Sequence, residues 1–578
     1  TGLWSSNYVL PYAGTPSAIR LVASRVSLPT TLSAVHLLDA LPPDVAAIWA
    51  APSSVVLCDP PAVPRELPRA HVFADHSEYI ALLRRMLAVG MVSVSASRPL
   101  CVNGLFGVEK DNGESIRLIV DARAANLHFR KPPDPQLPSP SDVAALRLPV
   151  GERLLVAKCD LSNCYHSLIV PAWLAEYFGL PAVTAGELGL AGVPPETLVW
   201  PRCVRLAMGF SHAVDLAQRS NLRLLFESGV LARDLVLPGG HDLDLSRPRV
   251  ICYLDDVVFL GLERHRSLLA GMQQAYIEEG SRQGWVFADK KLRLPSLQGD
   301  VLGLCLDGSA GTYSLAPGKM DDLTRDTERL LLLPSVSVRL LRTIVGKFIW
   351  GMLCFRPALS AFNHVFRWLA RQELLGVQFA ALGPAVAREL RIAAAVLPLA
   401  VADLRAGFFP HVVATDASEI GFGVVAATPK PEVVLDVAAC AGPLSVPGGA
   451  VGDSPRDLRS LTPYRVPPAL RQLLNERFRL IVSSPVRVDS HISSLEATAA
   501  GIGFRWALSS PAAIGSRLLL LVDNTAVCCA LAKGRSSSFL LSQNIAKSAA
   551  FQLASAARVI PVWVPTADNP ADAASRLR

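Results

Sequence analysis

The sequence predicts an α+β fold divided into several domains. With 578 residues the chain is longer than one hydrophobic core usually supports, and 51% of its residues are hydrophobic, enough to fill several cores. Strand-like apolar runs that end in an acidic residue occur in two separate parts of the chain, before residue 315 and after residue 408. A stretch with helical periodicity separates these parts.

The first part begins with residues 1–70, which contain prolines and short apolar runs but no recognisable motif, so their role is unknown. LFGVEKDNGESIRLIVDAR (105–123) predicts a β-hairpin, because two apolar runs flank an Asp-Asn-Gly turn. The other elements expected before residue 300 are a helix at 76–90, a strand ending at Asp160, a helix at 212–228, a loop at 237–249, and a helix, turn and strand at 276–294.

Helical patterns dominate from about 318 to 405, with Pro334 and Pro357 as expected breaks. HVVATDASEIGFGVVAA (411–427) restarts a β pattern. Residues 428–490 are rich in Pro, Ser and Arg, which predicts a long inserted loop. The elements expected after this loop are a helix at 494–508, a strand at 517–522, a helix at 536–556 and a strand at 559–564.

Charge and cysteine content narrow the class of protein. A net charge of +7 fits a polyanionic partner such as nucleic acid. The 11 cysteines show no paired C-x-x-C spacing, so we expect reduced, buried thiols in an intracellular protein, cytoplasmic or nuclear and not secreted. No apolar run approaches the roughly 18 residues that span a bilayer, so no membrane contact is expected. The chain starts at Thr1, which suggests a piece of a longer polyprotein.

Two adjacent acids interrupt the apolar run ICYLDDVVFLG (251–261). Burying an ionised carboxylate is costly unless it is paired or binds a metal, so Asp255 and Asp256 require a cation. Asp160, which follows the apolar run LLVAKC, is the best third ligand. Three carboxylates at neighbouring strand ends suit two magnesium ions that act in phosphoryl transfer.

The motifs around these acids resemble those of reverse transcriptases. VAKCDLSNCYHSL (156–168) is similar to the first palm motif, and YLDD (253–256) to the Tyr-x-Asp-Asp signature. RLAMGFSHAVDLAQ (205–218) resembles the motif around Gly-Phe, VEKDNGESIRLIVDAR (108–123) the fingers motif, and Lys290 or Lys291 with the LGL of VLGLCLDG (301–308) the later palm motifs. The resemblance implies a right-hand polymerase, with fingers and palm at 71–315 and a helical thumb or connection at 316–407.

The same resemblance implies roles for individual residues. Asp160 and Asp255 would be the principal metal ligands, with Asp256 supporting and the Leu161 carbonyl completing one shell. Tyr165 matches the steric gate that selects deoxynucleotides. The residues expected to contact the nucleotide are Lys110 and Arg117 at the triphosphate, Met208 and Gly209 in the pocket, and Lys290. Met208 stands where many relatives carry Gln, which affects substrate affinity and fidelity but not the chemistry.

A second set of acids lies in the C-terminal part. Asp416, Glu496, Asp523 and Asp572 fall at strand ends and helix starts, and together they resemble the metal-binding quartet of ribonuclease H. The resemblance implies a ribonuclease H-like α/β domain at 408–578, with an insertion at about 428–490. Asp568 competes with Asp572 for the last place, and Val562 stands where relatives often carry a histidine.

The expected function is therefore that of a retroelement RNA-directed DNA polymerase with a fused ribonuclease H. The NPAD-x-x-SR ending is similar to gypsy-type and DIRS-type retrotransposons. The expected cofactor is Mg²⁺, two ions per site, with Mn²⁺ as an alternative. The expected partners are an RNA template, a DNA primer, the RNA–DNA hybrid, deoxynucleoside triphosphates and other proteins of the element. Two alternatives stay open: an inactive or domesticated relic that only binds nucleic acid, and an RNA-dependent RNA polymerase.

Overall fold

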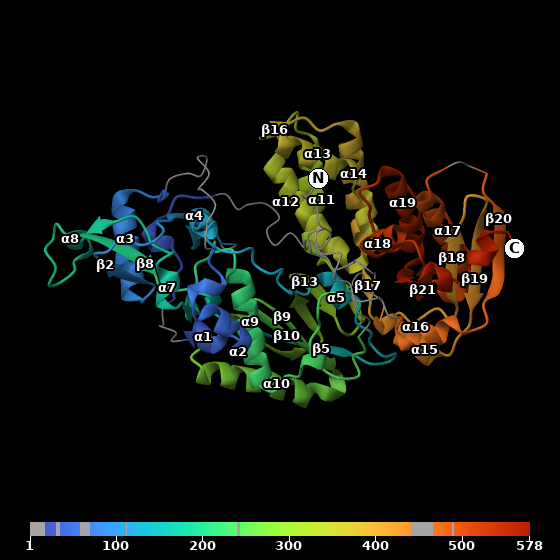
Figure 1. Ribbon diagram of the computed structural model, residues 1–578, viewed down its shortest axis with the longest axis horizontal. Coiled ribbons are helices and arrows are strands. Elements are labelled where there is room, and N and C mark those ends of the chain that lie inside the picture. The colour runs from blue at the N-terminus through green and yellow to red at the C-terminus, as the bar shows by residue number, and fades with distance from the viewer. Residues whose placement is uncertain are drawn as a thin grey trace.

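The computed structural model describes residues 18–29, 35–57, 70–110, 113–239, 243–440, 466–487 and 490–577. These residues form a mixed α/β chain of several domains, in agreement with the predicted class (Figure 1). The molecule is elongated, with the N-terminal half at one end, the C-terminal domain at the other and a group of helices standing above the middle. Among the described residues, no helix is both long and apolar enough to cross a membrane.

Part of the predicted N-terminal extension belongs to the core. Trp49 is buried and stacks against Trp173 at 6.1 Å between ring centroids. Strand β1 pairs in parallel with β6, and Leu37 and Leu41 are fully buried. The elements of this segment are η1 (Ala23–Arg25), β1 (Val35–His36), α1 (Leu37–Ala40), α2 (Pro43–Trp49) and η2 (Pro52–Ser54). Residues 1–17, 30–34 and 58–69 lie outside the described residues.

The predicted hairpin is confirmed as β3 (Gly104–Glu109) and β4 (Ile116–Asp121), which pair from Gly104 opposite Asp121. Asp111 and Asn112 of its turn lie outside the described residues. The predicted helix at 76–90 is α3 (His76–Ala88). Together with β2 (Val92–Ser95), α8 (Ala185–Leu188) and β8 (Leu198–Cys203), these elements form the N-terminal lobe at one end of the molecule (Figure 1). Its smaller elements are α4 (Arg123–Asn126), α7 (Ala172–Ala175) and β7 (Val183–Thr184).

A four-stranded antiparallel sheet, hereafter the central sheet, lies beside this lobe, in the order β11-β5-β10-β9. Both of its faces are covered: Leu155 and Ala157 of β5 enter one core, and Leu154 and Val156 enter another. Burial on both sides explains the nearly continuous apolar runs of its strands. The strands and the helices on one face are β5 (Leu154–Asp160), α6 (Cys164–Ser167), β6 (Leu168–Ile169), α9 (Ala213–Glu227), β9 (Arg249–Tyr253), β10 (Asp256–Leu262), α10 (Arg266–Arg282) and β11 (Arg293–Ser296).

Residues 317–399 form a group of helices, hereafter the helical arm, as the periodicity predicts. The first helix ends at Leu331, shortly before Pro334, and Pro357 lies in a 3₁₀ segment whose Phe355 is not helical. The arm comprises α11 (Pro317–Leu331), α12 (Val338–Met352), η6 (Leu353–Ala361), α13 (His364–Leu374) and α14 (Pro384–Val396), with the short strands β15 (Val336–Ser337) and β16 (Phe379–Ala380). A sheet of β12 (Gln298–Val301), β13 (Leu304–Asp307), β14 (Thr312–Ser314) and β17 (Ala402–Asp403) joins the arm to the central sheet.

The C-terminal domain contains a five-stranded sheet in the order β20-β19-β18-β21-β22. The pairs β18–β21 and β21–β22 are parallel, and the pairs made by β19 are antiparallel. Helices α17, α18 and α19 pack on one face, and α15 and α16 pack on the other. The elements are β18 (Val412–Ala417), β19 (Gly421–Ala427), α15 (Pro431–Cys440), α16 (Pro468–Leu474), β20 (Arg479–Pro485), α17 (Ile492–Ala507), β21 (Arg517–Val522), α18 (Thr525–Lys533), α19 (Phe539–Ser555), β22 (Arg558–Trp563) and α20 (Asp572–Ser575).

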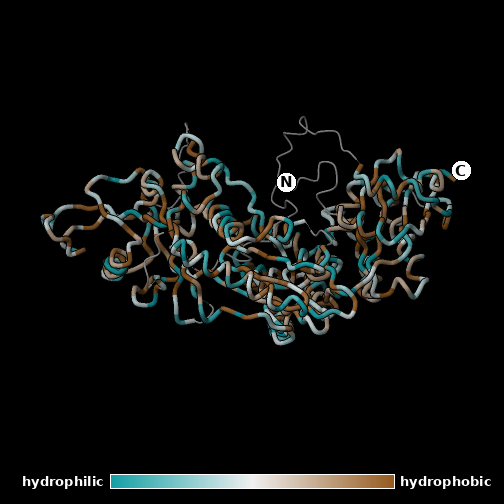
Figure 2. Tube along the Cα trace, turned by 90° about the horizontal axis from the view of Figure 1, so that it is seen from below, coloured by the Kyte–Doolittle hydropathy of each residue, from teal (hydrophilic) through white to brown (hydrophobic). Residues whose placement is uncertain are grey.

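The interpretation of residues 428–490 as one inserted loop is wrong for the described part of this range. It contains α15, α16 and the edge strand β20, which pairs with β19. The apolar side chains Val433, Val437 and Leu473 were the missed signal, because they cover the second face of the sheet. Figure 2 shows hydrophilic and hydrophobic residues interspersed along the described chain. Residues 441–465 and 488–489 lie outside the described residues.

Two candidate acidic centres

The first centre lies where β5 and the β9–β10 hairpin end together. Asp256 is the register partner of Asp160 across β5 and β10, and Asp255 occupies the hairpin turn. The Leu161 amide donates to the Asp255 carbonyl at 2.9 Å, which joins the two strand ends. The three acids predicted to act together are therefore neighbours in the fold.

Helix α9 holds the turn that carries these acids. The preceding residue, Leu254, has a left-handed φ of +56°, a conformation that costs a non-glycine residue energy. Gln218 accepts a hydrogen bond from the Leu254 amide at 2.8 Å, and Asn221 donates to the Leu254 carbonyl at 2.6 Å. Both amide side chains are buried, and neither was predicted as a site residue from the sequence.

Two lysines pair with the acids of this centre. Lys291 Nζ lies 2.6 Å from Asp160 Oδ2, and Lys158 Nζ lies 3.0 Å from Asp256 Oδ2. Of the two lysines considered from the sequence, Lys291 and not the preferred Lys290 reaches the acids, because the 3₁₀ turn η5 (Asp289–Lys291) places only its last residue there. Lys158 was missed, although strand alternation puts it on the same face as Asp160.

Two carboxyl groups of this centre, those of Asp160 and Asp255, have raised pKa values. Burial raises the pKa of Asp160 to about 7, the neighbouring Asp256 and Asp255 add to the effect, and Lys291 opposes it. Burial and then Asp256 also raise the pKa of Asp255. Asp256 Oδ1 is buried and has no hydrogen-bond partner. Oxygen donors in this condition fit a divalent cation, which would supply the missing positive charge.

Cations of the N-terminal lobe lie near the first centre, and Arg117 is close enough to Asp255 to lower its pKa. The pKa of Lys110 is lowered by burial, then by Arg117 and Lys291, so these three groups lie within electrostatic reach of one another. Lys110 Nζ donates to Ser27 Oγ at 2.9 Å, while Arg117 is exposed on β4. These cations are suited to bind an anionic ligand that lies between the N-terminal lobe and the acids.

The predicted pocket residues lie beside β4 and β5. Met208 accepts a hydrogen bond from the Val120 amide at 2.9 Å. Gly209 has a φ of +116°, and a Cβ there would lie 2.0 Å from the Val120 carbonyl oxygen, so this close approach requires glycine. Tyr165 lies half-buried on the short helix α6, five residues after Asp160. Leu161 is buried at the end of β5.

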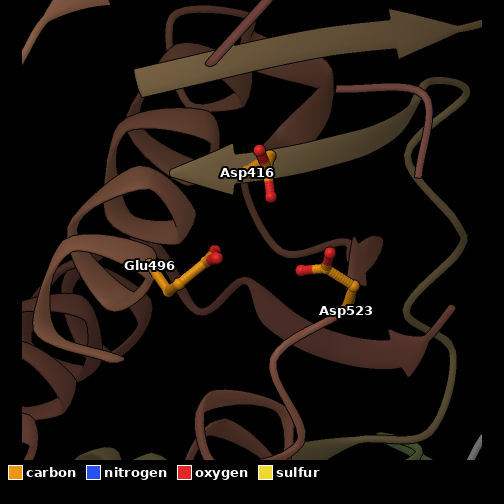
Figure 3. Close-up of side chains that lie close together, drawn as sticks. All are labelled: Asp416, Glu496 and Asp523. Atoms are coloured by element: carbon orange, nitrogen blue, oxygen red, sulfur yellow. The ribbon is translucent and has the colours of Figure 1, made fainter. Parts of the chain in front are cut away.

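The second centre lies in the C-terminal domain. Asp416 comes from β18, Glu496 from α17 and Asp523 from the end of β21, and the three side chains point toward one another (Figure 3). One carboxylate oxygen of each lies within 4.8 Å of the others. Among the residues that the structure describes, no other group of three or more acids, histidines and cysteines meets this criterion, and the acids of the first centre do not converge so closely. The carboxylates line a cavity of about 690 Å³.

Burial dominates the electrostatics of the second centre. It raises the pKa of Asp416 to about 6 and that of Glu496 to about 9, with further increases from the neighbouring acids. Ser575 Oγ donates to Asp416 Oδ2 and lowers its pKa, whereas Glu496 Oε2 is buried without a partner. The carboxylate oxygens of these neighbouring acids suit divalent cations, because one protein cation would not satisfy all of them.

Asp572 lines the same cavity but is not one of the three converging acids. Arg576 holds its carboxylate with contacts of 2.9 to 3.0 Å. The competing Asp568 is exposed in η10 (Thr566–Asp568) and does not line the cavity, and Val562 is buried in β22. Ser575 and Arg576 were not predicted as site residues, although both belong to the quoted ending NPADAASR.

Comparisons with known proteins gave structural neighbours only. No family model and no curated protein matches the chain. Similar solved structures include a foamy viral protease-reverse transcriptase dRH in complex with double-stranded DNA, at 11% identity and a TM-score of 0.43, covering 94% of this chain and 80% of that chain. Another is a foamy viral protease-reverse transcriptase in complex with RNA/DNA hybrid, at 12% identity and a TM-score of 0.42, covering 96% and 85%.

Proposed function

We propose that the chain is a retroelement RNA-directed DNA polymerase with a fused ribonuclease H. The single observation that carries this proposal is the presence of two acidic centres in one chain, each built at strand ends and each with a buried carboxylate oxygen that lacks a protein partner. The first lies within the ordered motifs that resemble a reverse transcriptase, and the second has the acid order of ribonuclease H. In this reading the N-terminal lobe, central sheet and helical arm correspond to fingers, palm and thumb.

At the first centre Asp160, Asp255 and Asp256 would hold two Mg²⁺ ions, with Mn²⁺ as an alternative. Bound ions would activate the primer hydroxyl and neutralise charge on the leaving pyrophosphate. Lys110 and Arg117 would bind the triphosphate, and Lys291, displaced from Asp160 by a metal, would become a further phosphate contact. Tyr165 would exclude a ribose 2′-hydroxyl, and Met208 and Gly209 would shape the pocket beside β4.

At the second centre Asp416, Glu496 and Asp523 would hold the metal ions, with Asp572 joining them at the rim of the cavity. Bound ions would supply a nucleophilic water for hydrolysis of the RNA strand. Ser575 keeps Asp416 oriented by donating to its carboxylate. Arg576 keeps Asp572 beside the cavity by donating to its carboxylate.

The direct test uses a primed RNA template, deoxynucleotides and Mg²⁺. We expect Asp255→Asn to abolish DNA synthesis and preserve hybrid cleavage, and Asp523→Asn to do the reverse. Unchanged synthesis by Asp255→Asn contradicts the polymerase assignment. Hybrid binding without Mg²⁺-dependent activity in the unmodified chain would identify a binding relic, and a preference for ribonucleotides would identify an RNA polymerase.

A further inference from the structure

Two arginines join the C-terminal domain to the segment that leads into the catalytic strand β5. Arg517 and Arg558 are the first residues of β21 and β22, and they are register partners in the parallel pair. Arg517 donates to the carbonyls of Ala145 at 2.9 Å and Leu146 at 2.7 Å, and Arg558 donates to the carbonyl of Ala144 at 2.9 Å. These carbonyls belong to the C-terminal end of α5 (Pro140–Ala144) and the residues just after it.

The contact is buried and directional. Arg517 is only 2% exposed, although it carries one of the largest charged side chains. A buried guanidinium requires hydrogen bonds in fixed directions, and carbonyls at a helix end carry partial negative charge that suits it. A contact of this kind tolerates little sliding between the two parts that it joins.

Helix α5 is itself fixed to the rest of the molecule. Asp142 caps its first turn and accepts a hydrogen bond from the Gly239 amide at 2.9 Å. Ser141 donates to the Leu353 carbonyl at 3.0 Å and accepts from Arg356 at 2.7 Å, which connects α5 to the helical arm. Val143 of α5 and Leu154 of β5 lie in the same hydrophobic core.

The connection between the arm and the C-terminal domain is also fixed. Arg405 donates to the carbonyls of Ser309 and Ala310 beside β14. The Arg517 amide donates to the Gly407 carbonyl at 2.7 Å, and the Phe409 amide donates to the Arg517 carbonyl at 2.8 Å. The connecting residues 404–409 are therefore tied at both ends and do not form a free linker.

We infer that Arg517 and Arg558 are positioning residues that hold the second acidic centre at one distance from the first. Under the proposed function, on which this inference rests, the enzyme cleaves the RNA strand at a fixed distance from the DNA 3′ end. The arginines touch neither substrate nor acid, so they act through α5. Their loss frees the C-terminal domain to sample several positions along the hybrid.

The test uses a 5′-labelled RNA annealed to a shorter DNA primer, in Mg²⁺ without deoxynucleotides. We expect a narrow cluster of cuts for the unmodified protein, and a cluster two to three times wider for the R517M/R558A double variant. Total cleavage of a long hybrid with blunt ends, where the DNA 3′ end does not guide placement, stays within twofold. Arg505 is an exposed arginine that donates to the Gly501 carbonyl within α17, so Arg505→Ala serves as the matched control with an unchanged cluster.

If the double variant does not fold, Arg558→Ala alone gives the same readout, because this half-exposed side chain also donates to α5. An unchanged narrow cluster in the folded variant overturns the inference, as does an unmodified protein that cuts without a preferred distance. Small-angle X-ray scattering of the metal-free protein separates the inference from the proposed function. If the chain has neither activity, the scattering still tests the positioning role. A distance distribution for the R517M/R558A variant that is no broader than that of the unmodified protein overturns this role.

Discussion

The two acidic centres differ in how the protein compensates their negative charge. In the first, lysine ammonium groups lie 2.6 and 3.0 Å from Asp160 and Asp256. In the second, a serine hydroxyl is the donor to Asp416, and burial raises the pKa of Glu496 to about 9. Side-chain cations thus compensate the charge of the first centre, whereas a hydroxyl and the proton of Glu496 compensate the charge of the second. The comparison teaches that similar acids at strand ends acquire different chemistry from their immediate neighbours.

The largest expected effect separates the centres by activity. Glu496→Gln removes a ligand oxygen, so we expect hybrid cleavage to fall by at least about 100-fold while DNA synthesis stays within twofold. Because the carboxyl of Glu496 holds its proton at neutral pH, the variant should unfold in EDTA at nearly the temperature of the unmodified protein. A gel assay of both activities and a thermal melt measure these effects. Equal loss of both activities would contradict the separation.

The second effect concerns pH. Burial raises the pKa of Asp416 to about 6 and of Glu496 to about 9, so the folded state binds these protons more tightly than the unfolded state does. The resulting stability is complete below the unfolded pKa of about 4 and is lost as the pH rises through the folded values. In EDTA we expect a loss of about 1.4 kcal/mol per pH unit for each titrating group within its window.

Denaturation in EDTA between pH 5 and 9 measures this loss. Added Mg²⁺ should restore more stability at pH 9 than at pH 6, because metal binding competes with protons. Glu496→Gln should flatten the dependence. A stability that is constant between pH 6 and 9 in EDTA would show that these carboxyls do not titrate as described.

A smaller effect comes from the lysine at the first centre. Lys291→Ala removes the ammonium from Asp160, so the carboxyl binds its proton more tightly and competes less well for metal. We expect synthesis to fall about tenfold at pH 7 and to recover partly at pH 8.5, with about 1.4 kcal/mol corresponding to each tenfold step. Lys290→Ala is the matched control, since Lys291 and not Lys290 reaches Asp160. Equal effects of both substitutions on DNA synthesis would contradict a specific role of the contact between Lys291 and Asp160.

The last expected effect concerns stability alone. Gly209→Ala places a Cβ 2.0 Å from the Val120 carbonyl and forces an unfavourable φ, at a cost of about 1–3 kcal/mol in unfolding free energy. Gly271→Ala in α10, where nothing lies within 4 Å, should instead stabilise the protein by about 0.5–1 kcal/mol. Urea denaturation distinguishes the two, and equal effects would contradict the required close approach.

The sequence predicted the elements best where burial on one or both faces produced a regular pattern. The hairpin at 105–123, the strand at 517–522 and the helix at 212–228 are confirmed within a few residues. Helix α18, which begins two residues after Asp523, was not expected. Strand β20 was missed because an exposed edge strand lacks alternation. The converging acids Asp416, Glu496 and Asp523 were identified from order and spacing, as implied by the resemblance.

Contacts between distant residues were not visible in the sequence. Ser575 reaches Asp416 across 159 positions, and Lys291 reaches Asp160 across 131. Such pairs depend on how helices and strands pack, and neither residue type nor local spacing distinguishes them from exposed serines and lysines. The burial of Trp49, in the N-terminal segment 1–70, likewise depends on how helices and strands pack.

The buried amides of α9 give that N-terminal segment a mechanical importance. Gln218 and Asn221 hold the turn before Asp255, and on the same helix Arg223 donates to the Leu41 carbonyl. The helix thus connects the turn that carries Asp255 with residues 35–57. A change that loosens the N-terminal segment would therefore shift Asp255 and its neighbours without touching them. Under the proposed function, a ligand bound to this remote surface would alter DNA synthesis through α9.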